Sequence, residues 1–311
     1  MRQAEGEVRT TAYDAARLVA AMPRLVLEAR RVAISVYHGL HGRRRAGPGE
    51  NFWQYRRFVD GEPASRVDWR RSARDDLLFV REREWEAAHT IWIWPDCSPS
   101  MVFTSSDKVT PKRDRALVLA FALGELLVRG GERVGIPGIM RPTASRAVIN
   151  RMADTIVHFA GEAQSLPPPF HPGSRDEVVL LGDLWSPTQQ VKDAIATLGA
   201  NGAGGHVVQI VDQAEETFPY SGRIEFEEPE GAGSITVGRA EAWAADYIER
   251  VARHRGEIRT AAARRGWSFA IHRTNRPASE LLLALHARMS ASPDALPHMQ
   301  AAAGPVEEAA A

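Results

Sequence analysis

The spacing of apolar residues divides the chain into a helical start, a short aromatic stretch and a long region of alternating strands and helices. In residues 11–41, apolar side chains recur at three- and four-residue steps, which predicts an amphipathic helix. We expect this helix to dock against the main domain through its apolar face. Pro23 lies inside it and should kink or divide it, because proline removes a helical hydrogen bond.

Beyond residue 90, continuous apolar runs alternate with longer segments of helical periodicity. The runs at residues 91–94, 177–182 and 206–211 are typical of strands buried on both faces, and a last strand is expected at residues 267–271. Residues 133–140 predict two short strands around a Pro-Gly turn. Helical segments follow at residues 111–130, 145–160, 186–199, 240–265 and 277–289. Such alternation predicts an α/β fold with a doubly wound, mostly parallel sheet.

The same pattern predicts four parts of the chain. Residues 1–42 form an amino-terminal helical segment, and residues 43–89 form a small β-rich module rich in arginine and aromatic residues. Residues 90–290 form the α/β domain, with a Glu-, Gly- and Pro-rich hairpin insertion at residues 213–238. Residues 291–311 are rich in alanine and proline, and we expect a disordered tail.

Composition narrows the class of protein. The 311 residues are 44% hydrophobic and 25% charged, with a formal net charge of zero, as in a globular protein without a general attraction for nucleic acid or membrane. The single cysteine, Cys97, excludes an internal disulfide and fits a reducing, cytoplasmic setting. The charged amino terminus leads into no apolar core, so we expect no signal peptide. The 13-residue apolar run at 116–128 contains Glu125, so we expect no membrane span.

The arginine-rich module raises the alternative of a nucleic-acid surface. Residues 43–84 contain eleven arginines, interleaved with aromatic residues, as in some nucleic-acid binders. Eight acids in the same stretch cancel most of that charge, so we expect no nucleic-acid partner. We expect the arginines to pair with carboxylates, and we expect Trp69→Ala to destabilise the module by about 3–5 kcal/mol if the indole is buried.

The chemistry of the α/β domain starts after its first strand. Asp96, Ser98 and Ser100 follow that strand directly, at the strand end where ligands bind in open α/β sheets. One carboxylate and two hydroxyls are half of a site for a hard cation such as magnesium. The same short polar residues are also typical of an ordinary turn.

Two further acids, Asp183 and Asp212, follow later strands of the sheet. Asp183 can complete a metal site with Asp96, or it can be a residue at the start of the next helix. Asp212 stands in the same kind of position and is interpreted as a turn residue outside the site. Cys97 alternates away from Ser98, so we interpret it as a packing residue and assign no catalytic residue.

The motif Asp96-x-Ser98-x-Ser100, followed by Asp183, resembles the metal-ion-dependent adhesion site of von Willebrand factor A domains. Such domains also use a threonine from the loop after the third strand. Thr143 is the matching position, although Ser145 lies equally near in the sequence. The resemblance implies a magnesium site, or one for manganese or calcium, formed by Asp96, Ser98, Ser100, Thr143 and Asp183.

A second resemblance comes from residues 52–82, with Phe52-x-x-Tyr55-Arg56, Gly61-Glu62, Arg66-Val67-Asp68-Trp69-Arg70 and Leu78-Phe79-Val80-Arg81-Glu82. This run is similar to the signature of domain-of-unknown-function family fifty-eight, bacterial proteins that join such a module to a von Willebrand A-like domain. Asp60-Gly61-Glu62-Pro63 replaces the usual Pro-Gly-Asp turn. The resemblance implies a MoxR-type AAA+ ATPase, or its client protein, as the partner.

Two functions follow from these features. The first is a non-enzymatic adaptor that binds a protein partner through a metal-dependent face, in protein assembly or maturation. The alternative is a metal-assisted hydrolase of a phosphate or peptide substrate. The two key loops contain no histidine or glutamate that would serve as a general base, which favours the adaptor.

Overall fold

The structure is a computed structural model of the chain. It describes residues 2–41, 54–59, 62–74, 77–82, 88–159, 164–229 and 233–289. The chain forms two compact units. The larger comprises Met1–Tyr37 with His89–Ala311, and the smaller comprises His38–Ala88. The expected tail at 291–311 lies outside the described residues.

A six-stranded sheet forms the centre of the larger unit, with strand order β10-β7-β6-β3-β4-β5. Five neighbouring strands run parallel, and only β5 runs antiparallel to its neighbour β4 in the described sheet. The prediction of an α/β fold with a mostly parallel sheet is confirmed. The strands are β3 (Thr90–Pro95), β4 (Arg133–Ile136), β5 (Met140–Thr143), β6 (Glu177–Gly182), β7 (Gly204–Val211) and β10 (Ser268–Arg273).

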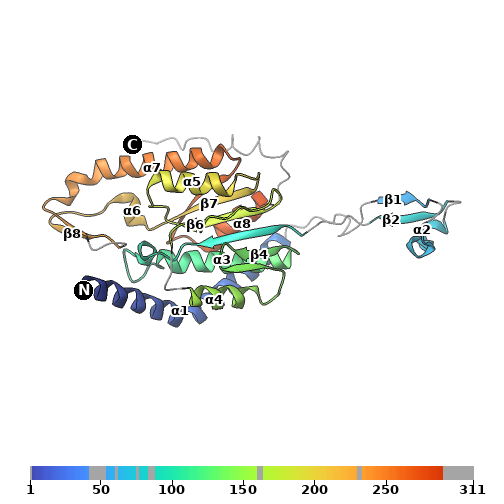
Figure 1. The fold of residues 1–311 in the computed structure, drawn as a ribbon, viewed down its shortest axis with the longest axis horizontal. Helices are drawn as coiled ribbons and strands as arrows, with labels where there is room; N and C mark the ends of the chain where they lie inside the picture. Colours follow the sequence, from blue (N-terminus) through green and yellow to red (C-terminus); the bar gives the residue numbers. More distant parts are fainter. Residues whose placement is uncertain are drawn as a thin grey trace, which may run out of the picture. The chain divides into compact units, whose positions relative to one another are not determined.

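Helices cover both faces of this sheet. Figure 1 shows α5 and α7 on one face, and α1, α3 and α4 on the other. Nearly every residue of α3 is buried, because the sheet covers one side of it and α4 and α8 pack against it elsewhere. The helices of this unit are α1 (Arg2–His41), α3 (Lys112–Arg129), α4 (Val148–His158), α5 (Thr188–Leu198), α6 (Gln213–Thr217), α7 (Ala244–Ala263) and α8 (Ala278–Met289).

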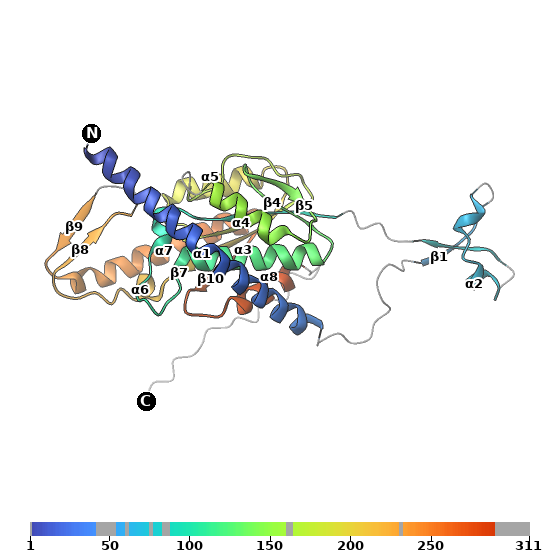
Figure 2. The same cartoon turned by 90° about the horizontal axis from the view of Figure 1, so that it is seen from below.

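The first helix docks along α3, as its apolar stripe predicts. Figure 2 shows α1 lying across α3 and α4, and Arg24 forms an ion pair with Asp114 of α3. Arg30 donates a hydrogen bond of 2.9 Å to Asn150 of α4. Pro23 does not divide the helix, which runs unbroken from Arg2 to His41. The buried face consists of Leu18, Met22, Leu25, Ala29, Ala33 and Val36.

The insertion after β7 begins with the short helix α6 and continues as a hairpin. Strands β8 (Ile224–Glu227) and β9 (Ser234–Val237) pair antiparallel. The ring of Phe218 stacks on Phe226 of the hairpin and lies tilted against Tyr247 of α7, with ring centroids 5.8 Å and 4.8 Å away. These ring contacts hold the insertion against α7.

The smaller unit contains a strand pair, within the module for which the sequence predicts β structure. Strands β1 (Gln54–Arg57) and β2 (Phe79–Glu82) are antiparallel, and Asp68 caps the short helix α2 (Trp69–Ser72). The guanidinium of Arg71 lies 4.7 Å from the centroid of the Phe79 ring, which supports a structural role for this arginine. The condition set for Trp69 is not met, because its side chain is 61% exposed.

No helix in the described part of the chain is long and apolar enough to cross a membrane.

His272 of β10 should make the stability of the larger unit pH-dependent. Burial, together with the charge of Arg115, lowers its pKa from 6.5 to about 4, and the side chain is 4% exposed. Because the folded pKa is depressed, its contribution to stability is complete above pH 6.5 and is lost as the pH falls toward 4. We expect the free energy of unfolding to drop by roughly 2 kcal/mol between pH 7 and pH 4.5 on this account.

Urea unfolding of wild type and of His272→Gln at both pH values measures this drop. The variant should lose that part of the pH dependence, whereas His171→Gln, a matched change at an exposed position, should keep it. An equal drop in wild type and His272→Gln would contradict the prediction.

Candidate functional site

Two buried carboxylates stand at the carboxyl ends of adjacent strands. Asp96 follows β3 and Asp183 follows β6, and each is 1% exposed. These strands are parallel neighbours, with Pro95 opposite Leu181. The chain builds outward from β3 through β4 and β5 in one direction, then through β6, β7 and β10 in the other. The site therefore lies at the point where the strand order reverses, the usual location of a ligand site in such sheets.

A glycine allows Asp96 to lie against the end of β6. The backbone N–H of Asp96 donates to the carbonyl of Leu181 at 2.8 Å, which continues the pairing of β3 and β6. A Cβ atom at Gly182 would lie 2.8 Å from both Cβ and Oδ2 of Asp96. Any larger residue at position 182 would displace this carboxylate, so the close approach requires glycine.

The two serines lie directly beside Asp96. The N–H of Ser98 donates to Oδ1 of Asp96 at 2.8 Å, and the hydroxyl oxygens of Ser98 and Ser100 are 3.2 Å apart. Ser100 lies in a short 3-10 helix, η2 (Pro99–Val102). The turn and the site interpretations are therefore compatible, because the turn itself brings these three oxygen-bearing side chains together.

Asp183 has a partner that the sequence did not reveal. Lys112, the first residue of α3, is 1% exposed, and its ammonium donates to Oδ2 of Asp183 at 2.9 Å. It also donates to Oε1 of Glu215 at 2.5 Å. A lysine in the first turn of a buried helix is unfavourable for the helix dipole, and this was the one available signal in the sequence. Lys112 thus links three segments at the carboxyl edge.

The surroundings keep Lys112 charged. Burial by itself lowers the pKa of Lys112, but the charges and hydrogen bonds of Asp183 and Glu215 outweigh burial and raise the pKa. Glu215 is itself fixed, because it accepts hydrogen bonds from the indole of Trp185 at 3.2 Å and from the N–H of Asp212 at 2.8 Å. A permanent positive charge therefore stands next to Asp183.

The turn after Asp183 has an unusual backbone. Leu184 has a φ of 58°, in the left-handed region that leucine rarely adopts, and its side chain is 3% exposed. Its carbonyl lies 2.7 Å from Nε2 of His254, whose other ring nitrogen lies 2.8 Å from the hydroxyl of Thr188. The N–H of Trp185 donates to Oδ1 of Asp183 at 3.2 Å. These contacts hold the carboxylate in one orientation.

The structure does not bring Thr143 to the other four residues. Thr143 pairs with Val134 of β4, and Val134 pairs with Ile91 near the amino end of β3. Asp96 lies five residues beyond Ile91, or roughly 16 Å along the strand. Because β5 runs antiparallel, its end lies at the opposite edge of the sheet from the ends of β3 and β6. The Thr143 hydroxyl instead accepts from the N–H of Ser145 at 3.1 Å.

A serine from a distant segment contacts the loop that follows Asp183. The hydroxyls of Ser165 and Ser186 are 2.8 Å apart, and Ser186 lies in the loop that follows Asp183. The carbonyl of Ser165 accepts a hydrogen bond from the indole N–H of Trp94 at 3.4 Å. This bond connects the loop that carries Ser165 to the end of β3. No motif in the sequence pointed to Ser165, because only the packing of its loop places it here.

Asp212 caps a helix, as interpreted from the sequence. It forms a capping box with Glu215 at the start of α6, with Oδ1 accepting from the N–H of Ala214 at 2.9 Å. Oδ2 accepts from the N–H of Ser105 at 3.0 Å, which fixes the loop between η2 and α3. Asp212 therefore positions the loops around the site.

The residues at the carboxyl edge fit a hard divalent cation. Asp96, Ser98 and Ser100 offer one carboxylate and two hydroxyl oxygens, the ligand types that magnesium prefers. Asp183 binds Trp185 and Lys112, but a carboxylate has about four acceptor positions, so it retains capacity for an ion. Among the described residues no three His, Cys, Asp or Glu side chains gather as a metal site. Such an ion would therefore depend on the serine hydroxyls.

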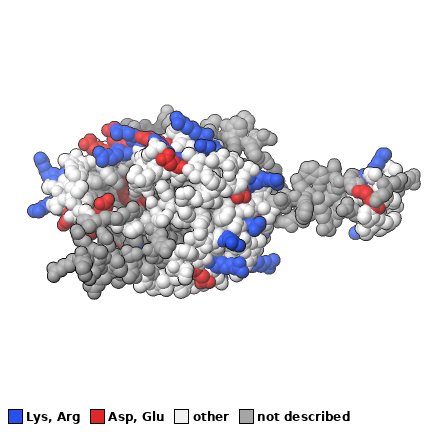
Figure 3. Space-filling view, in the orientation of Figure 1, with Lys and Arg blue, Asp and Glu red and all other residues white. Residues whose placement is uncertain are grey.

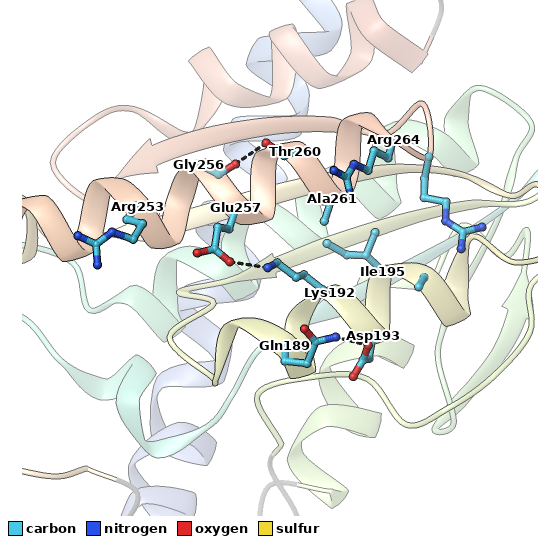
Figure 4. A pocket seen from close by; sticks show the side chains of 12 residues that line it. Gln189, Lys192, Asp193, Ile195, Arg253, Gly256, Glu257, Thr260, Ala261 and Arg264 are labelled. Carbon is cyan, nitrogen blue, oxygen red and sulfur yellow. Dashed lines mark hydrogen bonds and ion pairs between the residues drawn. The ribbon is translucent and has the colours of Figure 1, made fainter.

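Charge elsewhere on the larger unit is mixed. On the face shown in Figure 3, basic and acidic side chains stand close together over the upper helices, and uncharged side chains cover most of the rest of the described surface. A groove of about 780 Å³ lies between α5 and α7, and in Figure 4 Lys192 and Glu257 face each other across it as an ion pair. Neither feature provides the single-sign surface typical of nucleic-acid binding.

Comparison with known proteins identifies the family. The family described as "Protein of unknown function DUF58" matches residues 54–257, more than half of the 311 residues. This chain belongs to the DUF58 family. The match covers strands β1 and β2 of the smaller unit and continues through most of α7.

Relatives of this DUF58 protein include uncharacterized protein Mb1516 of Mycobacterium bovis and uncharacterized protein Rv1480 of Mycobacterium tuberculosis. Each is 31% identical over 122 residues, which cover 39% of this chain and 38% of the relative. The match thus spans well under half the length of these curated relatives.

Two solved structures also align with this chain. An aerotolerance-related membrane protein from Bacteroides fragilis matches 64% of this chain and 98% of its own, with 13% identity and a TM-score of 0.37. The conserved hypothetical protein BatB from Bacteroides thetaiotaomicron matches 65% and 98%, with 12% identity and a TM-score of 0.32. With TM-scores this low, neither similarity supports a conclusion about function.

Proposed function

We propose that this DUF58 protein is a non-enzymatic adaptor that binds a protein partner at the carboxyl edge of its sheet. In this proposal the α/β domain is von Willebrand factor A-like, and Asp96, Ser98, Ser100 and Asp183 hold a divalent cation, magnesium or else manganese or calcium. The cation keeps an open position for a carboxylate of the partner. The observation that supports it is the gathering of two carboxylates and two hydroxyls at the reversal point of the strand order.

The environment of the site supports binding over hydrolysis. A hydrolase needs a general base within hydrogen-bond reach of its substrate. The carboxylate of Glu215 holds the ammonium of Lys112, and the two ring nitrogens of His254 contact Thr188 and Leu184. In this proposal Asp96 and Asp183 hold the cation, and Glu215 and His254 are committed to the loops around the site. A metal-assisted hydrolase is therefore the weaker candidate.

The proposed partner is a MoxR-type AAA+ ATPase or the client of such an ATPase, acting in protein assembly or maturation. This step rests on the family resemblance, because family members are commonly paired with these ATPases. The physical requirement on the partner is an exposed acidic side chain, which would complete the coordination shell of the ion.

We expect Asp96→Ala to weaken magnesium binding by about a hundredfold. Loss of a residue that only hydrogen-bonds to a metal ligand already weakens metal binding by about 10- to 100-fold, and Asp96 is itself a proposed ligand. The variant removes one of the two anionic ligands. Calorimetric titration with magnesium measures the loss, and a pulldown with the MoxR-type ATPase, in magnesium and then in EDTA, measures its effect on partner binding.

One control variant and one second test variant accompany this experiment. Asp193→Ala removes an exposed carboxylate of α5 and should leave both measurements unchanged. Ser100→Ala removes a half-buried hydroxyl and tests the site if Asp96→Ala fails to fold. ATPase binding that ignores both EDTA and the variants would exclude the metal-dependent face. Magnesium-dependent hydrolysis of a phosphoester or peptide, without ATPase binding, would replace the adaptor with an enzyme.

A further inference from the structure

An apolar pocket of about 280 Å³ adjoins the loop that carries Asp96, Ser98 and Ser100. The end of β3, the turn between β4 and β5, and α4 form its walls. Because β4 runs parallel to β3, the turn between β4 and β5 lies at the same edge of the sheet as the proposed metal site. Its lining includes the side chains of Trp94, Cys97, Ile136, Ile139, Ile156 and Phe159.

The rim of this pocket is built into the fold. Gly138, in the turn between β4 and β5, has a φ of 75°, and a Cβ atom there would lie 2.6 Å from Cγ of Pro168. The loop that carries Pro168 is tied to the end of β3 by the hydrogen bond between Trp94 and the carbonyl of Ser165. Contacts of this kind are expected of a pocket that exists before its ligand arrives.

The size of the pocket limits its occupant. Pockets for drug-sized molecules typically measure about 300–1,000 Å³, so 280 Å³ lies just below that range. A volume of this size holds one large apolar side chain. Cys97 adds its thiol to this lining, and a free cysteine packs like a small apolar residue.

The pocket and the polar site share one loop. Cys97 lines the pocket, while its chain neighbours Asp96 and Ser98 belong to the polar cluster. Asp96, Cys97 and Ser98 are consecutive, so a single short segment of the loop carries groups of both regions. A ligand that reaches both regions would carry a polar group and a bulky apolar group close together, as neighbouring residues of a peptide do.

We propose that the pocket binds an apolar side chain, leucine or larger, of the same partner segment whose carboxylate reaches the metal site. This inference rests on the proposed function and specifies its partner: an exposed peptide segment with an acidic residue next to, or one residue from, a large apolar residue. The acidic residue completes the ion's coordination, and the apolar residue determines which acidic segments bind.

Capped tripeptides test the pocket directly, using the full chain in magnesium. In one probe a single residue separates leucine from aspartate, and in the second probe alanine replaces the leucine. We expect the leucine probe to bind about fiftyfold more tightly, because three additional carbon atoms are removed from water. Equal affinities for the two probes, or no binding of the leucine probe, would overturn the inference.

Variants assign the preference to the pocket. Ile139→Trp fills the pocket from the half-buried position 139 and should abolish the leucine preference, whereas Ile235→Trp, the same change on the exposed hairpin, should keep it. Ile139→Ala enlarges the pocket, provides a second test if the tryptophan variant does not fold, and should shift the preference toward a phenylalanine probe. A leucine preference that survives Ile139→Trp would place the apolar contact elsewhere.

The same titrations separate this inference from the proposed function. Asparagine in place of aspartate, and EDTA in place of magnesium, should each weaken the leucine probe if the metal site binds the carboxylate. If the leucine preference persists while both changes have no effect, the pocket stands and the metal-dependent function fails. If both changes weaken binding while leucine and alanine bind equally, the function stands and the pocket inference fails.

Discussion

Replacing Lys112 by methionine should lower the free energy of unfolding by about 3–5 kcal/mol. The ammonium of Lys112 is buried between Asp183 and Glu215, and methionine matches its length without its charge. The variant leaves two carboxylates close together without their common cation. Removing one partner of a buried ion pair is costly because the remaining charge is neither solvated nor compensated. Urea unfolding at pH 7 measures the loss.

The matched control is Lys192→Met. Lys192 forms an ion pair with Glu257 between α5 and α7, but both side chains are substantially exposed, at 32% and 43%. Water replaces the lost partner there, so the variant should unfold at nearly the same urea concentration as wild type. Equal losses in the two variants would contradict the special role of Lys112.

The pH dependence of the free energy of unfolding provides a second test of the same ion pair. Because the folded pKa of Lys112 is raised above 10.5, its contribution to stability is complete below pH 10.5 and is lost as the pH rises through the folded pKa. Wild type should therefore lose this contribution at high pH, and Lys112→Met should not.

Cys97 should react with iodoacetamide at pH 8 about a hundred times more slowly in the folded protein than in the unfolded chain. Burial, reinforced by the charges of Asp96 and Asp114 and opposed by Arg113, raises the thiol pKa from 9.0 to about 12. The reactive species is the thiolate, so its concentration falls with the rise in pKa. The rise of the thiol pKa from 9.0 to about 12 would by itself slow the reaction about a thousandfold. We expect a smaller effect because Cys97 keeps some exposed surface in the pocket.

Cys97 is the chain's only cysteine, so the labelling rate reports on this site alone. The unfolded chain in urea at the same pH is the reference, and mass spectrometry follows the modification. The contribution of the neutral thiol to stability is complete below pH 9 and is lost as the pH rises toward 12, so labelling should accelerate over that range. A folded-state rate within tenfold of the unfolded rate would contradict the buried thiol.

Much of the site could be predicted from local sequence. The strands β3, β6 and β7 are continuous apolar runs, and such runs identify buried strands wherever they lie in the chain. Asp96, Ser98 and Ser100 lie within five residues, so one turn is sufficient to gather their side chains. The placement of Asp183 near Asp96 followed from the parallel arrangement, because parallel strands end at one edge.

Three predictions depended on contacts that the sequence does not encode locally. The position of Thr143 was misjudged because the antiparallel direction of β5 reverses the end of the sheet at which its loop emerges. The exposure of Trp69 depends on what packs over a small strand pair. The continuity of α1 through Pro23 depends on its support along α3, since packing offsets the local cost of proline.

The sequence by itself determined the alternation of strands and helices, the mostly parallel sheet and the local oxygen cluster after β3. These features follow from periodicity and from residues close together in the chain. Only the tertiary structure decided that Lys112 joins Asp183 and Glu215, 71 and 103 residues away, and that an apolar pocket adjoins the cluster. Such contacts arise when packing brings distant segments to one edge of the sheet, and no periodicity along the chain records which side chains will meet there.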